Sequence, residues 1–301
     1  MQVFLNDRFI PAEEAAINIY DLGVVLGATV TEMVRTFHQR PYRLEDHVGR
    51  IMRSVRYVRF DLDMAPEHLE DVCRELVSRN SAELGPGGEL GLVVFITAGE
   101  NRVYAGGAAG DIRTKPTVCV HTFPLPFPLW AKGMREGAHV VTPSIRHVPP
   151  QCYDPKVKYR SRMHYYLAEK EARLADPGAV PLLLDLDGNV TETSGSNFLV
   201  VRNGTIVSPT LRNILPGISR AVVIELAKKL RIPFVERDFQ VYDVINADEA
   251  FQTTTPYCIM PVTRINGLSI GDGEPGPIFR QLIGAWSDEV GLDIERQILS
   301  G

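Results

Sequence analysis

Apolar positions in the early part of the chain follow two different periods, and the period indicates which element each segment forms. Apolar residues on both sides of Asn6 and Asp7 predict a hairpin. TEMVRTF, which ends before the turn HQRPY, predicts a strand. A helix with one buried face is expected over 44–58, because apolar residues recur there every three or four positions: Leu44, Val48, Ile51, Met52, Val55 and Val58. A second helix is expected over 66–79. The short, β-branched run LGLVVFIT then predicts a buried strand.

The later part of the chain is richer in strand patterns. AHVV and VPLLLDLDGNV read as strands, the second ending in an Asp-Gly turn, and FLVVRNGTIV reads as a hairpin around Asn203 and Gly204. Helices are expected over 161–175 and in SRAVVIELAKKL. Many strands combined with two long helices favour a closed or pseudo-barrel sheet.

Between these parts, Pro124, Pro126 and Pro128 fall within five residues, a composition that favours an extended connector. We therefore predict a small N-terminal α/β domain over 1–123, a connector over 124–133 and a larger C-terminal domain over 134–301. A chain of 301 residues fits two compact domains better than one. The predicted fold class is α+β (α/β) with two domains.

Composition narrows the classes of partner. The net charge is -5, and lysines and arginines are interspersed with acids, so a nucleic-acid partner is not expected. The cysteines Cys73, Cys119, Cys152 and Cys258 form no CxxC pair, which indicates buried, reduced thiols and no metal site. Neither a signal peptide nor an apolar run of membrane-spanning length is found, so no membrane association and a cytoplasmic location are expected.

Two segments carry candidate chemistry. PKVKYRSR places Lys158 beside Lys156, Arg160 and Arg162, and neighbouring positive charge lowers the pKa of a lysine that must act as a nucleophile. TETSGSN carries the isolated carboxylate of Glu192. Without further context, the first segment could be a solvated basic patch and the second an exposed turn.

A phosphate site is also indicated. LPGIS precedes a helix, and the first N–H groups of a helix, together with the Ser219 hydroxyl, can bind an anion. Three consecutive threonines, 253–255, close an apolar strand further on.

The order of Lys158, TETSGSN, LPGISR and the threonine turn resembles the class IV aminotransferases, the fold type IV pyridoxal-phosphate enzymes, over nearly the whole chain. The resemblance implies that Lys158 holds pyridoxal 5′-phosphate and shuttles the substrate proton, and that Glu192 keeps the ring nitrogen protonated. The resemblance also implies that the C-terminal domain binds the cofactor. The remaining cofactor contacts that it implies are those of Arg50, Ile218, Ser219, Thr254 and Thr255.

The resemblance does not identify the substrate directly, because no subfamily signature is complete in this chain. Thr31 stands where branched-chain aminotransferases usually carry an aromatic residue. Ala98 and Glu100 stand where D-amino-acid aminotransferases have an arginine and a histidine, and Arg162 matches an arginine of aminodeoxychorismate lyases. Arg35 could bind a substrate carboxylate or pair with Glu32. The substrate-binding candidates are Thr31, Arg35 and Arg162.

The expected protein is a homodimeric aminotransferase of amino-acid metabolism, acting on branched-chain or other hydrophobic L-amino acids and 2-oxo acids. An aminodeoxychorismate lyase and a D-amino-acid or (R)-amine transaminase remain alternatives. The glycine-rich segment 105–110 could close over the substrate.

Overall fold

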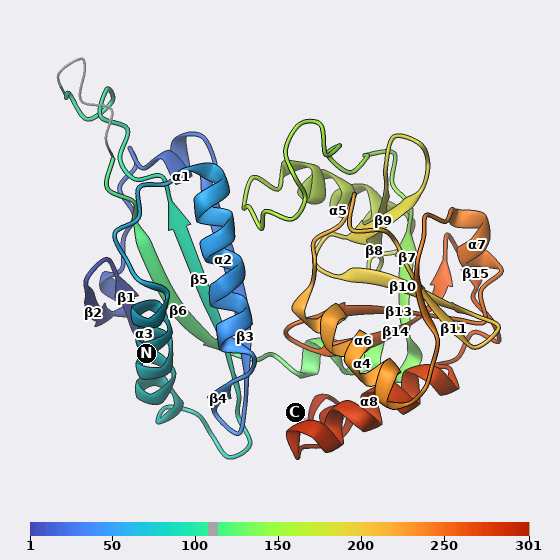
Figure 1. Cartoon of the computed structure of the whole chain (residues 1–301). Helices are drawn as coiled ribbons and strands as arrows, with labels where there is room; N and C mark the ends of the chain where they lie inside the picture. Colours follow the sequence, from blue (N-terminus) through green and yellow to red (C-terminus); the bar gives the residue numbers. More distant parts are fainter. Residues whose placement is uncertain (108–113, 301) are drawn as a thin grey trace. The chain divides into compact units, whose positions relative to one another are not determined.

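The computed structural model describes residues 1–107 and 114–300, which form two compact units (Figure 1). Unit 1 comprises Met1–Leu125 with Val157–Ser161, and unit 2 comprises Pro126–Lys156 with the chain from Arg162 onward. The short segment Val157–Ser161, which carries Lys158, therefore packs with unit 1, although both of its neighbours in sequence belong to unit 2. The predicted domain limits had assigned this segment to the C-terminal domain.

Unit 1 is built on an antiparallel sheet in the order β2-β1-β6-β5-β3-β4. The predicted N-terminal hairpin and the two predicted strands are confirmed. The strands are β1 (Gln2–Leu5), β2 (Arg8–Pro11), β3 (Thr29–Phe37), β4 (Arg40–Pro41), β5 (Leu90–Thr97) and β6 (Val118–Pro124).

Two long helices pack on this sheet (Figure 1), α2 (Leu44–Val58) and α3 (Pro66–Ser81). The predicted apolar stripe of α2 supplies buried side chains to one core with both helices and the sheet. The same helix also buries three polar side chains, His47, Arg50 and Ser54. The 3-10 helix η1 (Ala12–Glu14) and the short helix α1 (Leu22–Val25) lie between β2 and β3 in the chain.

Unit 2 contains the closed sheet that the sequence predicted. A ring runs β10-β13-β14-β7-β8-β9 and returns to β10 through the pair Asn197↔Glu192. Its strands are β7 (Ala138–Val141), β8 (Val180–Leu184), β9 (Val190–Thr193), β10 (Asn197–Arg202), β13 (Glu249–Thr254) and β14 (Cys258–Ile265). Strands β11 (Thr205–Ser208) and β12 (Phe234–Glu236) extend the sheet from β10, and β15 (Leu268–Ser269) pairs with β14.

The strands of the barrel share a cluster of buried apolar side chains that includes Phe198, Val200, Ala250 and Val262. The helices of unit 2 are α4 (Pro128–Glu136), α5 (Met163–Ala175), α6 (Ile218–Lys229), α7 (Val241–Ile245), α8 (Pro277–Val290) and α9 (Ile294–Ser300). Helix α6 packs against β13, and α5 packs against β8. None of the helices within the described ranges combines the length and apolar character needed to cross a membrane.

Three sequence predictions need correction or restriction. The predicted extended connector is wrong in its second half, where residues from Pro128 onward form α4. The prediction that every cysteine is buried is wrong for Cys152, which is exposed, while the other three are buried. The proposed closing segment 105–110 lies partly outside the described residues, which end at 107 and resume at 114.

Candidate active site

Glu192 lies on β9 with only 8% of its surface exposed, so it is not the exposed turn residue that the sequence left open. Its Oε1 accepts a hydrogen bond from the Tyr165 hydroxyl at 2.9 Å and lies 3.4 Å from His147 Nε2. Its Oε2 accepts from Asn197 Nδ2 at 3.0 Å and from the Leu215 backbone N–H at 3.1 Å. A buried carboxylate with several donors is held in one orientation.

The same contacts join Glu192 to the predicted phosphate turn. Asn197 Nδ2 also donates to the Leu215 carbonyl at 2.9 Å, so Asn197 links β9 to the segment before α6. Gly217 is the residue before the first turn of α6, and a Cβ there would lie 2.0 Å from Asn197 Oδ1. Only a residue without a side chain lets the start of α6, with Ile218 and Ser219, approach Asn197 this closely.

The threonine turn also contacts TETSGSN, from β13, the strand that pairs with β10. Thr254 ends β13, and its hydroxyl donates to the Gly195 carbonyl at 2.8 Å, within TETSGSN. Asn197 pairs with Thr253 across the two strands. Unit 2 therefore brings together five of the predicted residues: Glu192, Ile218, Ser219, Thr254 and Thr255.

Glu192 and His147 form a buried pair that determines the charge of this cluster. Burial alone would raise the pKa of the Glu192 carboxyl, but His147, the Tyr165 hydroxyl and the Leu215 N–H hold that pKa below its ordinary value. Burial would likewise lower the pKa of His147, but Glu192 outweighs it and raises that pKa. Glu192 is therefore a carboxylate at neutral pH.

Lys158 lies in unit 1, beside β3 and α2. Its carbonyl accepts from the Thr31 N–H at 2.8 Å, and its N–H lies 3.4 Å from the Ser54 hydroxyl. Lys158 is half-buried, and its charge adds to burial, the main cause, in lowering the pKa of His47. Lys156 is exposed, and its ammonium lies 3.3 Å from the Asp154 carboxylate. The two lysines therefore have different environments, one exposed and one half-buried.

Arg50 is buried on α2 and is therefore not a surface residue of that helix. Its Nε and Nη2 donate to the two carboxylate oxygens of Glu32 at 2.6 Å and 2.7 Å. His47 Nδ1 lies 2.8 Å from the same carboxylate. Burial alone would raise the pKa of Glu32, but Arg50 and His47 hold it far below its usual range.

The substrate candidates have different environments. The Thr31 hydroxyl donates to the Val94 carbonyl across the sheet at 2.9 Å. Arg35 is buried with its guanidinium 3.9 Å from the centre of the Phe37 ring, and side-chain alternation along β3 puts it on the face opposite Glu32. Arg162 precedes α5 in unit 2, with its guanidinium 6.0 Å from the Tyr165 ring. Their roles toward a substrate stay predictions.

Sequence reasoning missed four side chains that form the contacts around Arg50 and Glu192 described above. They are Glu32, His47, His147 and Tyr165. Each is far in sequence from the group that it contacts, so no local motif connects them. The one available signal was the buried face of α2, because His47 and Arg50 are separated by three positions and therefore lie on the same side of that helix.

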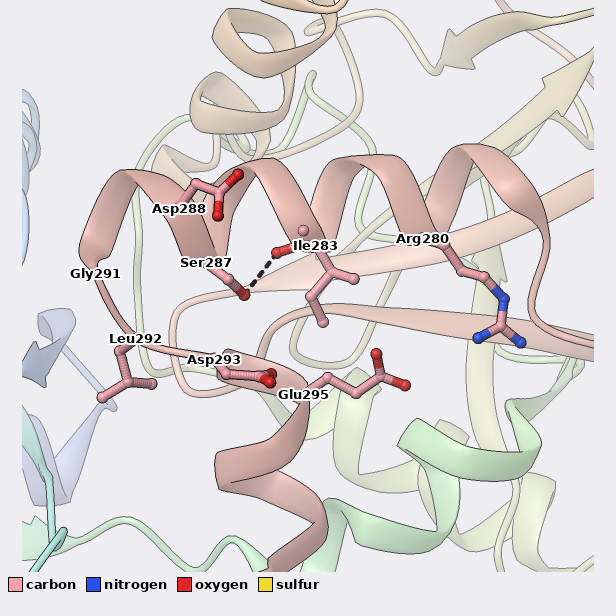
Figure 2. A pocket seen from close by; sticks show the side chains of 9 residues that line it. Arg280, Ile283, Ser287, Asp288, Gly291, Leu292, Asp293 and Glu295 are labelled. Atoms are coloured by element: carbon pink, nitrogen blue, oxygen red, sulfur yellow. Dashed lines mark hydrogen bonds between the residues drawn. The ribbon is translucent and has the colours of Figure 1, made fainter.

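Unit 2 also has two hollows with other lining residues. One, of about 580 Å³, lies along α8 from Arg280 to Gly291 and reaches the start of α9, with Arg280, Asp288, Asp293 and Glu295 around it (Figure 2). The other, of about 710 Å³, is bordered by α4 and by His139, Asp176 and Arg264. No predicted site residue is among the described residues that line either hollow.

Comparisons with known proteins all point to one family. A family model for amino-transferase class IV matches residues 29–265. The chain is 30% identical over 285 residues to a provisionally named branched-chain-amino-acid aminotransferase of Methanocaldococcus jannaschii, covering 94% of both chains. It is equally similar, with the same coverage, to D-alanine aminotransferase of Bacillus licheniformis.

Two solved structures give the same result for the fold. The branched-chain aminotransferase of Thermoproteus uzoniensis, solved with norvaline, is 26% identical with a TM-score of 0.85, covering 97% of this chain and 95% of that one. The branched-chain amino acid aminotransferase from T.th., solved with pyridoxamine 5′-phosphate, is 27% identical with a TM-score of 0.84, covering 96% of this chain and 94% of that one. Class IV aminotransferases are pyridoxal-phosphate enzymes. From its sequence match and its fold, this chain belongs to the class IV aminotransferases.

Proposed function

We propose that the protein is a pyridoxal 5′-phosphate-dependent aminotransferase that moves an amino group between branched-chain or other hydrophobic L-amino acids and 2-oxo acids. The observation that carries this proposal is the buried, ionised Glu192, joined through Asn197 and Leu215 to the start of α6.

The residues of unit 2 fit this cofactor. A buried carboxylate can accept the proton of a pyridinium nitrogen, and the N-terminus of a helix with nearby hydroxyls can bind a phosphate. Glu192 supplies the first group, and α6 begins at Ile218 with the buried Ser219 as its second residue. Because Asn197 contacts both regions, the two groups keep a fixed relation to each other.

Bound pyridoxal phosphate would supply an electron-withdrawing ring that stabilises negative charge at the substrate Cα. Lys158 would form the covalent link, take the proton from the substrate Cα and return it to the C4′ carbon of the cofactor. Glu192 would keep the ring nitrogen protonated. The phosphate would be held by Arg50, Ser219, Thr254, Thr255 and the N–H of Ile218.

The substrate class is inferred from relatives and from what this chain lacks. One relative and both solved structures are named as branched-chain aminotransferases. Ala98 and Glu100 replace the arginine and histidine of the D-amino-acid subfamily, which favours the L-amino-acid assignment. The D-alanine aminotransferase relative keeps a D-amino-acid transaminase as the second candidate. Thr31, Arg35 and Arg162 are the proposed substrate contacts.

The test is a half-reaction with the cofactor-loaded protein and no amino acceptor. Separate mixing with L-leucine, L-glutamate, D-alanine, an (R)-arylamine and aminodeoxychorismate is followed by the cofactor absorbance. A spectral change with the L-amino acids supports the proposal. A change only with D-alanine or the arylamine would replace its substrate, and pyruvate release from aminodeoxychorismate alone would identify a lyase.

Lys158→Ala should abolish the half-reaction, since no other group is proposed to move the Cα proton. Lys156→Ala is the matched control, because that lysine is exposed only two residues away. It should retain the rate of the unaltered protein. Equal rates for Lys158→Ala and the unaltered protein would contradict the catalytic assignment.

The family resemblance also implies a homodimer or a higher homo-oligomer, which we propose together with a cytoplasmic location. Light scattering tests the first part of this proposal, and fractionation of the source cells tests the second.

A further inference from the structure

The side chains behind Glu192 form a short chain of hydrogen bonds whose protons can be counted. His147 Nδ1 lies 3.0 Å from the Val148 carbonyl oxygen. A carbonyl can only accept, so Nδ1 carries a hydrogen. On the other side of the ring, Nε2 lies 3.1 Å from the Tyr165 hydroxyl and 3.4 Å from Glu192 Oε1.

The Tyr165 hydroxyl has one hydrogen, and both Glu192 Oε1 and His147 Nε2 lie within hydrogen-bonding distance of it. It donates to Glu192 Oε1 at 2.9 Å, which leaves no hydrogen for His147 Nε2. This arrangement is therefore complete only if Nε2 also carries a hydrogen, and His147 is then an imidazolium. If Nε2 loses its hydrogen, it becomes an acceptor that competes with Glu192 for the single hydrogen of Tyr165.

Charged groups from each packed element act on His147. Glu192 on β9 and Asp185 after β8 both favour its protonated form. From α5, Tyr165 contributes its hydroxyl, and the His164 ring lies 5.7 Å away, centre to centre. Burial, with the charges of His147 and Arg162, lowers the pKa of His164 to about 4, so His164 adds no positive charge near neutral pH.

We propose that His147 is a positioning residue for Glu192, and that its protonation decides whether the Tyr165 hydroxyl donates to the Glu192 carboxylate. With His147 protonated, both oxygens of Glu192 have fixed donors. With His147 neutral, Oε1 loses the hydrogen of Nε2 and competes with Nε2 for that of Tyr165, while Oε2 keeps Asn197 and Leu215. Only one oxygen of the carboxylate then keeps uncontested donors.

The consequence for the cofactor rests on the proposed function of Glu192. A carboxylate fixed at both oxygens is oriented before it meets the ring nitrogen, whereas a loosened one must be ordered on binding. Deprotonation of His147 should therefore weaken retention of pyridoxal phosphate as the pH rises.

The first experiment needs no cofactor. Histidine side-chain ¹⁵N resonances of the full-length chain are followed against pH. We expect the His147 transition to lie above the ordinary value of about 6.5, and to move below it in Glu192→Gln. A His147 ring that is already neutral at pH 6 in the unaltered protein would overturn the proposal. So would a transition unchanged in Glu192→Gln.

The second experiment measures the dissociation constant of pyridoxal phosphate at pH 6.5 and pH 8.5. The permanently neutral His147→Gln should bind about tenfold more weakly than the unaltered protein at pH 6.5, and the difference should shrink at pH 8.5. His147→Arg, which keeps a cation, should restore the affinity and remove this part of the pH dependence. The control is His68→Gln, an exposed histidine on α3 in unit 1.

The outcomes separate this inference from the proposed function. Equal pH dependence in His147→Gln and the unaltered protein would overturn the positioning role. Absence of pyridoxal phosphate binding in every variant, with the expected ¹⁵N transition, would overturn the cofactor assignment while supporting the His147–Glu192 pair. If His147→Gln does not fold, Tyr165→Phe removes the hydroxyl through which His147 is proposed to act, so the pH dependence of pyridoxal phosphate binding should become smaller than in the unaltered protein. An unchanged pH dependence would overturn the positioning role.

Discussion

At the scale of single residues, the buried carboxylate of Glu32 has the largest expected effect on stability. Glu32→Gln keeps the shape but leaves the buried guanidinium of Arg50 without its bidentate partner. Breaking a buried ion pair on one side costs about 3–5 kcal/mol, so the free energy of unfolding in urea should fall by that amount. Glu83→Gln, whose carboxylate is half-exposed beside the N-terminal ammonium, should cost less than about 1 kcal/mol.

The pH dependence of that difference follows from the pKa of Glu32, which folding depresses. A depressed carboxyl pKa contributes stability above the unfolded pKa of about 4.3 and loses it as the pH falls toward the folded value. The gap between the unaltered protein and Glu32→Gln should therefore be constant from pH 7 to about pH 5.5 and shrink below about pH 4. A gap that widened in acid would contradict the ion-pair explanation.

Also at this scale, sequence reasoning could select Lys158 and Glu192 as candidates because each lies in a recognisable local motif. It could not locate His147 or Tyr165, which act on Glu192 from 45 and 27 positions away. The choice of rotamer and the direction of each hydrogen bond depend on packing, which a linear pattern does not contain. For Arg35, however, the strand period alone already separates it from Glu32.

At the scale of elements, the start of α6 depends on a single missing side chain. Gly217 has an ordinary extended backbone with φ -65°, so Gly217→Ala introduces no backbone strain. Its Cβ would instead meet Asn197 Oδ1 at 2.0 Å, which must displace either Asn197 or the first turn of α6. We expect a loss of about 1–3 kcal/mol in urea unfolding and weaker binding of pyridoxal phosphate.

Gly284→Ala on α8 is the matched control, because no atom outside the neighbouring backbone lies within 4 Å of its Cβ position. In the interior of a helix this change should stabilise the protein by about 0.5–1 kcal/mol. Equal effects of the two substitutions would show that Asn197 does not restrict the start of α6.

Element types followed from the sequence wherever one period was sustained, as in α2, β5 and the hairpin of β10 and β11. At that hairpin, Asn203 and Gly204 adopt φ 49° and 72°, as an Asn-Gly turn requires. The error at α4 has a physical reason. Three prolines suggested an extended connector, but Pro128 occupies the first turn of a helix, where its missing N–H costs nothing.

At the scale of the whole molecule, closure of the barrel and construction of the site depend on the same contact. The pair between β9 and β10 is Asn197↔Glu192, and the side chains of these residues are also hydrogen-bonded. Strand patterns could predict that the sheet closes, but not which residues meet where it closes. The return of Val157–Ser161 to unit 1 was equally hidden, because this segment is too short to show a period of its own.

Assembly is the last property at this scale. A stable homodimer needs an apolar centre, and α1 with its flanks exposes Ile19, Val24 and Leu26 by 71%, 61% and 70%. Light scattering should give twice the chain mass, 2 × 33.5 = 67 kDa. Leu26→Glu should shift the mass toward 33.5 kDa, whereas Val235→Glu on β12 should not, because a charge on an exposed edge strand is tolerated. A monomeric unaltered protein would contradict the dimer, and a dimeric Leu26→Glu would move the interface away from α1.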